Sequence, residues 1–152
     1  MKYSQSPCSN DLSSLAQELQ ISALGIARNH AIPPEVINTY QQWIDAEKHG
    51  EMAYMAKYKE IRLNPQELLP GTQSIIVAAF NYHSPIKTPA DNPQFASYSL
   101  GDDYHEVVRE RLSLLASFIQ EKWGGVTRVC VDTAPIFERY WAQQAGVGFI
   151  GR

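Results

Sequence analysis

The segment from Tyr104 to Trp123 constrains the fold most strongly, because its apolar residues recur with the period of an α-helix. Charged residues fill the positions between them, so one face is apolar and the other is polar. Gly124 and Gly125 follow at once, and glycine is common directly after a helix. The apolar face consists of Val107, Val108, Leu112, Leu115, Ile119 and Trp123. The segment therefore predicts a long amphipathic helix that packs one face on a core.

Three shorter segments are apolar without helical spacing, and they predict strands. The run from Ser74 to Phe80 contains β-branched residues and is apolar on both faces, which is typical of a buried central strand. Residues 21–27 and 126–133 are interpreted as two further strands. Further helices are predicted over residues 11–19, 33–50, 51–60 and 136–145. The predicted class is therefore mixed α/β (α+β), with a mixed central sheet flanked by helices around one core.

The length of the chain favours a single domain. Its 152 residues suffice for one sizeable core but not for two ordinary domains. Residues 1–10 are polar and contain Pro7, so they are predicted to form a flexible N-terminal arm. The domain then covers residues 11–152, with Asp11 in position to cap its first helix.

Composition argues against several classes of protein. The longest apolar run is far short of the ~20 residues that a membrane span requires, and the first residues lack the apolar core of a secretory signal. Two cysteines, Cys8 and Cys130, are too few for a disulfide framework or a metal cluster, so a reducing, cytoplasmic setting is expected. A net charge of −3 lacks the basic excess of most nucleic-acid binders. Any RNA contact would therefore need a local patch or another part of the protein.

Asp132 is the first candidate for chemistry, because it ends an apolar segment and precedes Pro135. If Pro135 opens a helix, the side chain of Asp132 or Thr133 would cap the free N–H groups of that helix. Alternatively, a carboxylate at the C-terminal end of a strand lies where ligand clefts open, and it would act as a proton donor. Donation near neutral pH requires a raised pKa, which burial supplies. The local sequence leaves both interpretations open.

A second group of polar and aromatic residues precedes the long helix, where Tyr98 and His105 flank two aspartates. Asp102 or Asp103 is placed to cap that helix. A single histidine is more often structural than a metal ligand, and no second His, Cys or Asp set accompanies it at zinc-like spacing. No metal ligands are therefore predicted in this chain.

Two further features are ambiguous from local sequence. Arg62 is expected on an irregular loop, where an arginine is either solvated or recognises phosphate or carboxylate through its planar fork. The tail from Gly146 to Gly151 has the spacing of a dinucleotide-binding glycine motif, but it follows a helix and no acidic residue comes ~20 positions later. A flexible turn, or a close backbone approach to a ligand, is the preferred interpretation of this tail.

Taken in order, several motifs resemble those of the epoxyqueuosine reductase family. They run from about residue 49 to the last residue, and the fit is looser before that. The matching segments are His49-Gly50-Glu51-Met52, Arg62, Glu67-Leu68-Leu69-Pro70-Gly71-Thr72, Asn81-Tyr82, Tyr98-Ser99-Leu100-Gly101, Asp103-Tyr104-His105, Val131-Asp132-Thr133-Ala134-Pro135, Glu138 and Ala145-Gly146-Val147-Gly148-Phe149-Ile150-Gly151. Ordered motifs at fitting spacings are far more specific than any one of them.

The resemblance implies an enzyme of the last step of queuosine synthesis, which reduces an epoxide on a modified wobble base of tRNA to an alkene. Such enzymes use cobalamin and two 4Fe–4S clusters, and their N-terminal, cobalamin-binding domain is similar to nitroreductase-like and B12-processing folds. The family aspartate at the position of Asp132 protonates the departing epoxide oxygen. Arg62, Tyr98 and His105 fall where the family lines its cofactor or substrate cleft. The implied partners are tRNA carrying epoxyqueuosine and an electron donor domain, with no membrane.

Two features of the chain depart from the family pattern. Asp102 stands where relatives commonly have a basic residue, which would weaken a local contact to phosphate. The chain also has no cysteine cluster, so it is expected to be truncated before the iron–sulfur domain and inactive alone. The alternative functions are those of another corrinoid-dependent reductase, such as a dehalogenase relative, or of a binding module without chemistry.

Overall fold

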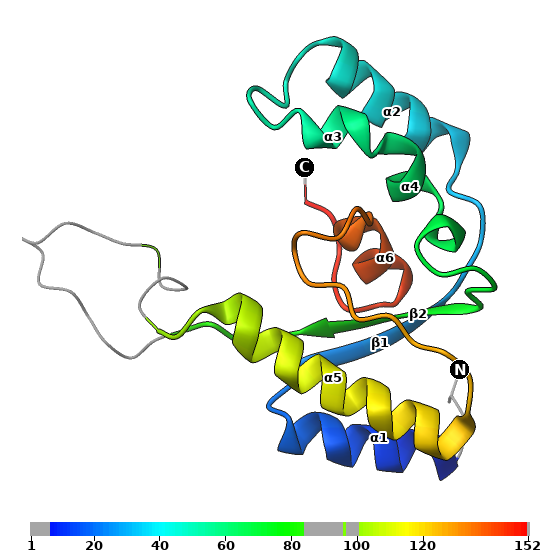
Figure 1. The fold of residues 1–152 in the computed structure, drawn as a ribbon, viewed down its shortest axis with the longest axis vertical. Helices are drawn as coiled ribbons and strands as arrows, with labels where there is room; N and C mark the ends of the chain where they lie inside the picture. The colour runs from blue at the N-terminus through cyan, green and yellow to red at the C-terminus, as the bar shows by residue number, and fades with distance from the viewer. Residues whose placement is uncertain (1–6, 84–95, 97–100, 152) are drawn as a thin grey trace, which may run out of the picture. The chain divides into compact units, whose positions relative to one another are not determined.

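The structure is a computed structural model that describes residues 7–83, 96 and 101–151, with side chains from residue 11 onward (Figure 1). The chain divides into two compact units, each built from two segments that are distant in sequence. The first unit combines residues 1–24 with 78–132, and the second combines residues 25–77 with 133–152. Helices and strands are mixed, which confirms the predicted class. The buried residues form two clusters, one in each unit, instead of the single core that was expected.

The strands β1 (Ala23–Arg28) and β2 (Ser74–Ala79) pair in an antiparallel sheet, which has two strands in the described part of the chain. At one end of the pair, the N–H of Asn29 donates to the carbonyl of Gln73 across 2.8 Å. Both strands lie where apolar runs predicted them. However, β2 is not the predicted buried central strand, because it pairs with one strand in the described part of the chain and its residue Ile76 is 36% exposed.

The predicted strand over residues 126–133 is wrong, because these residues form a loop. Apolar content alone does not make a strand; a strand also needs a neighbour that satisfies its backbone N–H and C=O groups. This segment has no such ladder among the described residues. Asp132 therefore does not lie at the end of a strand.

Two helices, α1 (Pro7–Glu18) and α5 (Tyr104–Trp123), lie side by side in the first unit (Figure 1). Their apolar faces meet in an aliphatic cluster. Its buried members are Leu12, Ala16, Ile21 and Leu115. The bounds of α5 agree with those predicted, since Gly124 directly after it adopts a φ of +75°. Among the described residues, no helix is long and apolar enough to cross a membrane.

The N-terminal helix α1 begins earlier than predicted. Residues 7–10 belong to the helix and not to a flexible arm, because proline has no N–H to satisfy and fits the first turn. Asp11 consequently lies inside the helix and is not its N-cap. Its carboxylate instead forms an ion pair with Lys122 of α5, within the first unit.

The described part of the second unit consists mainly of short helices. They are α2 (Pro34–Asp45), α3 (Tyr54–Lys57), α4 (Lys59–Leu63), the 3-10 helix η1 (Pro65–Glu67) and α6 (Glu138–Gln144). The single helix predicted over residues 51–60 is divided, because Tyr58 adopts φ −104° and ψ +25° between α3 and α4. The helix predicted to open near Pro135 starts three residues later, at Glu138.

Aromatic residues fill the core of the second unit. Trp141 is 0% exposed and lies against the ring of His30, with ring centroids 5.2 Å apart. Tyr40 meets Phe137 edge to face at 4.8 Å, and its hydroxyl donates to the carbonyl of Met55 across 2.9 Å. Burial raises the pKa of Tyr40. These contacts join α2, α3 and α6.

The end of α6 explains two of the glycines. Gly146 has a φ of +72°, its N–H donates to the carbonyl of Gln143, and the next N–H donates to the carbonyl of Ala142. This is a Schellman motif, so Gly146 serves to end a helix, in agreement with the predicted turn. Gly25 of β1 passes so close that a Cβ there would lie 2.2 Å from the carbonyl oxygen of Ala145.

Candidate functional site

Asp132 does not act as a helix cap. The helix that follows it, α6, begins at Glu138 with Phe137 as its N-cap residue and no side-chain cap bond. Asp132 instead lies on a loop with a φ of +49°, in the left-handed region that non-glycine residues rarely adopt. Such outliers cluster at functional sites, where surrounding contacts hold the strained backbone. The contacts of its side chain are therefore informative.

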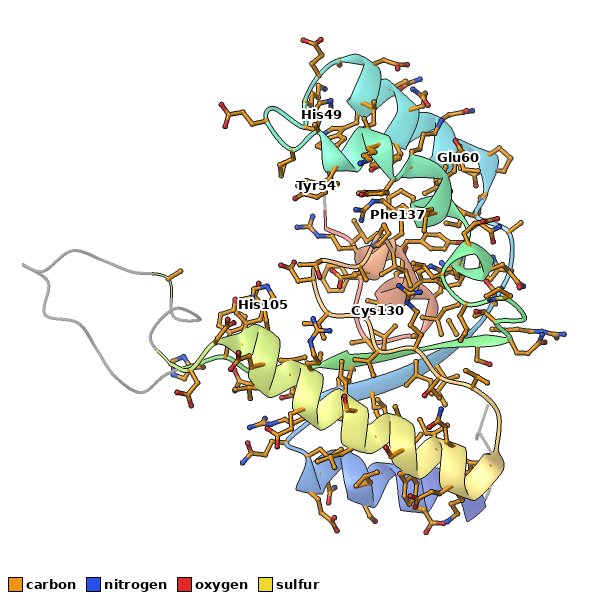
Figure 2. The ribbon with its side chains drawn as sticks, in the orientation of Figure 1. His49, Tyr54, Glu60, His105, Cys130 and Phe137 are labelled. Carbon is orange, nitrogen blue, oxygen red and sulfur yellow. The ribbon has the colours of Figure 1, made fainter. Side chains whose placement is uncertain are left out.

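The carboxylate of Asp132 contacts two residues at the start of α5. The hydroxyl of Tyr104 donates to Asp132 Oδ2 across 3.1 Å, and His105 Nε2 lies 3.1 Å from the same oxygen. The two rings stack on each other, with centroids 4.0 Å apart. Figure 2 shows His105 at the N-terminal end of α5. We call Asp103, Tyr104, His105 and Asp132 the α5 cluster; all four belong to the first unit.

Asp103 completes the α5 cluster and also starts the helix. Its Oδ1 accepts from the backbone N–H of His105 across 2.9 Å, so Asp103, one of the two aspartates predicted as candidates, is the N-cap. The same oxygen lies 2.8 Å from His105 Nδ1. The hydrogen bonds from the His105 N–H and ring lower the pKa of Asp103. The Asp103 carboxylate and, secondarily, Asp132 raise the pKa of His105.

The α5 cluster is open to solvent. The side chains of Asp132 and Asp103 are 56% and 59% exposed, and that of His105 is 35% exposed. Proton donation near neutral pH was expected to require burial of Asp132. The described residues do not bury its side chain. Asp132 Oδ1 accepts no hydrogen bond from them, so this oxygen is available to a bound molecule. A carboxyl group paired with an imidazole can hold and release a proton.

The structure brings together two of the four predicted site residues. Asp132 and His105 meet, whereas Tyr98 lies outside the described residues. Arg62 belongs to the second unit and lies on α4, where its Nη1 donates to the carbonyl of Ile136 across 3.0 Å. Its Nε is buried and has no hydrogen-bond partner among the described residues. Arg62 is therefore not a solvated loop residue, which was one of its two interpretations. Its place at the cofactor stays a prediction.

Tyr104 was not among the predicted site residues, although its neighbour His105 was. The available signal was the sequence Asp103-Tyr104-His105 at a helix start, where an N-cap aspartate and the second helical residue approach each other. The contact to Asp132 is 28 residues distant along the chain, and no local pattern indicates it. Among the residues described, no three His, Cys, Asp or Glu side chains converge to hold a metal ion.

The fold and the α5 cluster together define an α+β protein with an exposed acid–base site. A family model described as "Epoxyqueuosine reductase QueG, DUF1730" matches residues 62–133, a range that includes the whole α5 cluster. An epoxyqueuosine reductase of Leadbetterella byssophila is 34% identical over 95% of this chain and 48% of its own length. That of Vibrio cholerae is 38% identical over 100% of this chain and 42% of its own.

Solved structures agree with these sequence matches. A crystal structure of epoxyqueuosine reductase with an epoxyqueuosine-modified tRNA stem loop superposes with a TM-score of 0.71 at 28% identity. It covers 93% of this chain and 39% of the solved one. The Bacillus subtilis enzyme, described with its catalytic aspartate loop swung out of the active site, gives a TM-score of 0.69 at 25% identity.

The chain therefore belongs to the epoxyqueuosine reductase family, as the resemblance of its motifs predicted. It spans less than half the length of the relatives that it matches.

Proposed function

We propose that this chain is the N-terminal, cobalamin-binding part of a tRNA epoxyqueuosine reductase. The whole protein would reduce epoxyqueuosine to queuosine in tRNA. The observation that carries this proposal is the hydrogen bonding of Asp132 to Tyr104 and His105, on a chain whose relatives bear this name. Asp132 is the group that donates a proton to the epoxide oxygen as its bond to carbon breaks.

Two of the relatives support this assignment. One was solved with an epoxyqueuosine-modified tRNA stem loop, which supports tRNA as the partner of this chain. Another is described by a catalytic aspartate loop, and Asp132 also lies on a loop. The net charge of −3 means that affinity for tRNA would come from local groups or from a further part of the protein.

The exposed α5 cluster is compatible with a bound cobalamin. A corrinoid is a large group that carries many amides, and a few exposed polar side chains can contact those amides at the edge of its binding site. Asp103 and Asp132 are both more than half exposed, and Asp132 Oδ1 is unpaired among the described residues. When bound, cobalamin would supply the electrons. The residues of this chain would orient the substrate oxygen and deliver protons to it.

The two 4Fe–4S clusters of the family would belong to another part of the protein. Each such cluster is held by about four thiolates, and this chain has two cysteines. The chain alone is therefore expected not to turn over, and the cytoplasmic setting stays a prediction. Arg62, Tyr98 and His105 are the residues assigned to the cofactor or substrate.

Cobalamin titration of the purified chain tests the proposal most directly. We expect a change in the cobalamin absorption spectrum that saturates with added chain. A competing function in another corrinoid-dependent reductase predicts the same binding but activity on a different substrate. Absence of any spectral change would favour a binding module without cofactor chemistry.

The role of Asp132 is tested in an active protein that contains this chain. Asp132→Asn preserves the shape of the side chain, and asparagine tolerates the left-handed backbone at this position. Loss of the acidic proton should lower kcat for epoxide reduction by about 10²- to 10⁴-fold while cobalamin stays bound. His83→Gln, an exposed residue of the same unit, is the control. Unchanged kcat in Asp132→Asn would remove Asp132 from the mechanism.

A further inference from the structure

The stoichiometry of the proposed reaction raises a question about the source of protons. Conversion of an epoxide to an alkene breaks two carbon–oxygen bonds and forms one carbon–carbon π bond. It consumes two electrons, which the cobalamin cofactor would supply, and two protons, which leave with the oxygen as water. Asp132 has one acidic proton to give, so a second source is required near it.

We propose that His105 is this second source, and that Asp103 is the positioning residue that sets its geometry. The inference rests on the proposed function. Asp132 first donates its proton to the substrate oxygen, and His105 then passes the proton on Nε2 to Asp132 Oδ2. Asp132 donates again, water leaves, and His105 is reprotonated from solvent. Two protons are delivered, and one carboxylate contacts the substrate throughout.

The distances permit direct transfer between the two side chains. His105 Nε2 and Asp132 Oδ2 are 3.1 Å apart, which is hydrogen-bond distance for a nitrogen and an oxygen. Tyr104 holds this arrangement from two sides, because its ring stacks on His105 while its hydroxyl donates to Oδ2. The 35% exposure of the His105 side chain gives solvent access for its reprotonation.

Asp103 decides which nitrogen exchanges the proton. An ionised carboxylate only accepts hydrogen bonds, so Asp103 Oδ1 at 2.8 Å keeps a proton on His105 Nδ1. Nε2, facing Asp132, is then the nitrogen that gains and loses the second proton. The same Asp103 oxygen accepts from the His105 backbone N–H, so the capping bond that starts α5 also fixes the carboxylate beside the ring.

The charged groups that face His105 favour the protonated ring before the reaction. Among the described residues they are Asp103 at the start of its own helix, which acts throughout, and Asp132 on the loop, which acts when it is ionised; both raise the pKa of His105. Once Asp132 has given up its first proton, its carboxylate can accept the proton from Nε2 across this hydrogen bond, and donation to the substrate oxygen draws that transfer forward. His105 acts through Asp132, so its removal should slow proton delivery without weakening substrate binding.

The first test uses this chain alone and does not depend on activity. Nitrogen-15 NMR titration of His105 should show the Nδ1–H tautomer at high pH and a pKa that falls in Asp103→Asn. Asparagine remains a good N-cap, so α5 should stay intact in this variant. His83→Gln should leave the titration of His105 unchanged. A titration that Asp103→Asn does not alter would overturn the role of Asp103.

The second test uses an active protein that contains this chain. His105→Gln should lower kcat by at least about tenfold, with KM unchanged and a larger solvent deuterium isotope effect. Asp103→Asn should shift the alkaline limb of the pH–rate profile to lower pH. Wild-type kcat and isotope effect in His105→Gln would overturn the inference while leaving the proposed function intact. Failure of the wild-type protein to reduce the epoxide would instead overturn the proposed function.

Discussion

The two units use the same kinds of residue for different purposes. In the second unit, Tyr40 is buried and donates to a backbone carbonyl, and His30 packs against the buried ring of Trp141. In the first unit, Tyr104 and His105 are partly exposed and meet the carboxylate of Asp132. The tyrosine hydroxyl and the imidazole of the second unit thus contact backbone or a buried ring, whereas those of the first unit meet a carboxylate, where we propose that they serve acid–base chemistry.

The cores of the two units also differ, because one is aliphatic and the other is aromatic. The first unit has an aliphatic cluster between α1 and α5, which leaves the start of α5 free to carry polar groups. The second unit joins short helices through aromatic rings, with Trp141 at the centre. Short helices have little stability of their own, so their packing must supply it. We therefore expect stability to depend on the aromatic core and activity on the α5 cluster.

Truncation of Trp141 should have the largest effect on stability. Trp141→Ala removes the most buried side chain of the second unit and should lower the free energy of unfolding by about 3–5 kcal/mol, measured by urea denaturation. Trp123→Ala is the matched control, because this tryptophan is 42% exposed in the first unit. Equal losses in the two variants would contradict the proposed dependence on the aromatic core.

Addition of one methyl group at Gly25 should have the next largest effect. The new Cβ would lie 2.2 Å from the carbonyl oxygen of Ala145 and 2.8 Å from Val147 Cγ2, so backbone must move. Gly25→Ala should lower the free energy of unfolding by about 1–3 kcal/mol. Gly148→Ala places its Cβ in open space in the same unit and should be nearly neutral. A neutral Gly25→Ala would show that β1 and the end of α6 are farther apart.

Removal of single tyrosine hydroxyls compares the two units directly. Tyr40→Phe loses the bond to the Met55 carbonyl and should cost about 1 kcal/mol of unfolding free energy. Tyr104→Phe loses an exposed bond and should change stability by less than about 0.5 kcal/mol. In an active protein, the order of the two effects should reverse: Tyr104→Phe should lower kcat more than Tyr40→Phe does. If the same variant had the larger effect on both stability and kcat, the proposed division between a structural and a chemical tyrosine would be contradicted.

The pH dependence of stability should show the smallest effect, because the groups are exposed. The raised pKa of His105 means that its contribution is fully present below its unfolded pKa of about 6.5 and is lost as the pH rises through the folded pKa. The lowered pKa of Asp103 gives a contribution that is lost as the pH falls through that value. The melting temperature of the wild type should therefore fall more steeply from about pH 5 to pH 9 than that of His105→Gln. Parallel curves would contradict this coupling.

Sequence reasoning was accurate where structure depends on near neighbours. The bounds of α5 follow from its own apolar stripe and from Gly124, and the N-cap role of Asp103 follows from its place before the helix. It was wrong for residues 126–133, an apolar run that forms a loop, and for the helix predicted to open near Pro135. A strand and a helix start both depend on contacts that a local window does not contain.

The candidate site, too, was predicted in part from the sequence and in part only from the tertiary structure. The order and spacing of the motifs were sufficient, by themselves, to indicate the epoxyqueuosine reductase family and to single out Asp132 and His105. The capping role of Asp132 was excluded only by the tertiary structure, in which α6 begins at Glu138 and a loop brings Asp132 to Tyr104 and His105. Helical periodicity is a property of adjacent residues, whereas this contact closes 27 or 28 residues of chain, and its formation depends on how the whole first unit packs.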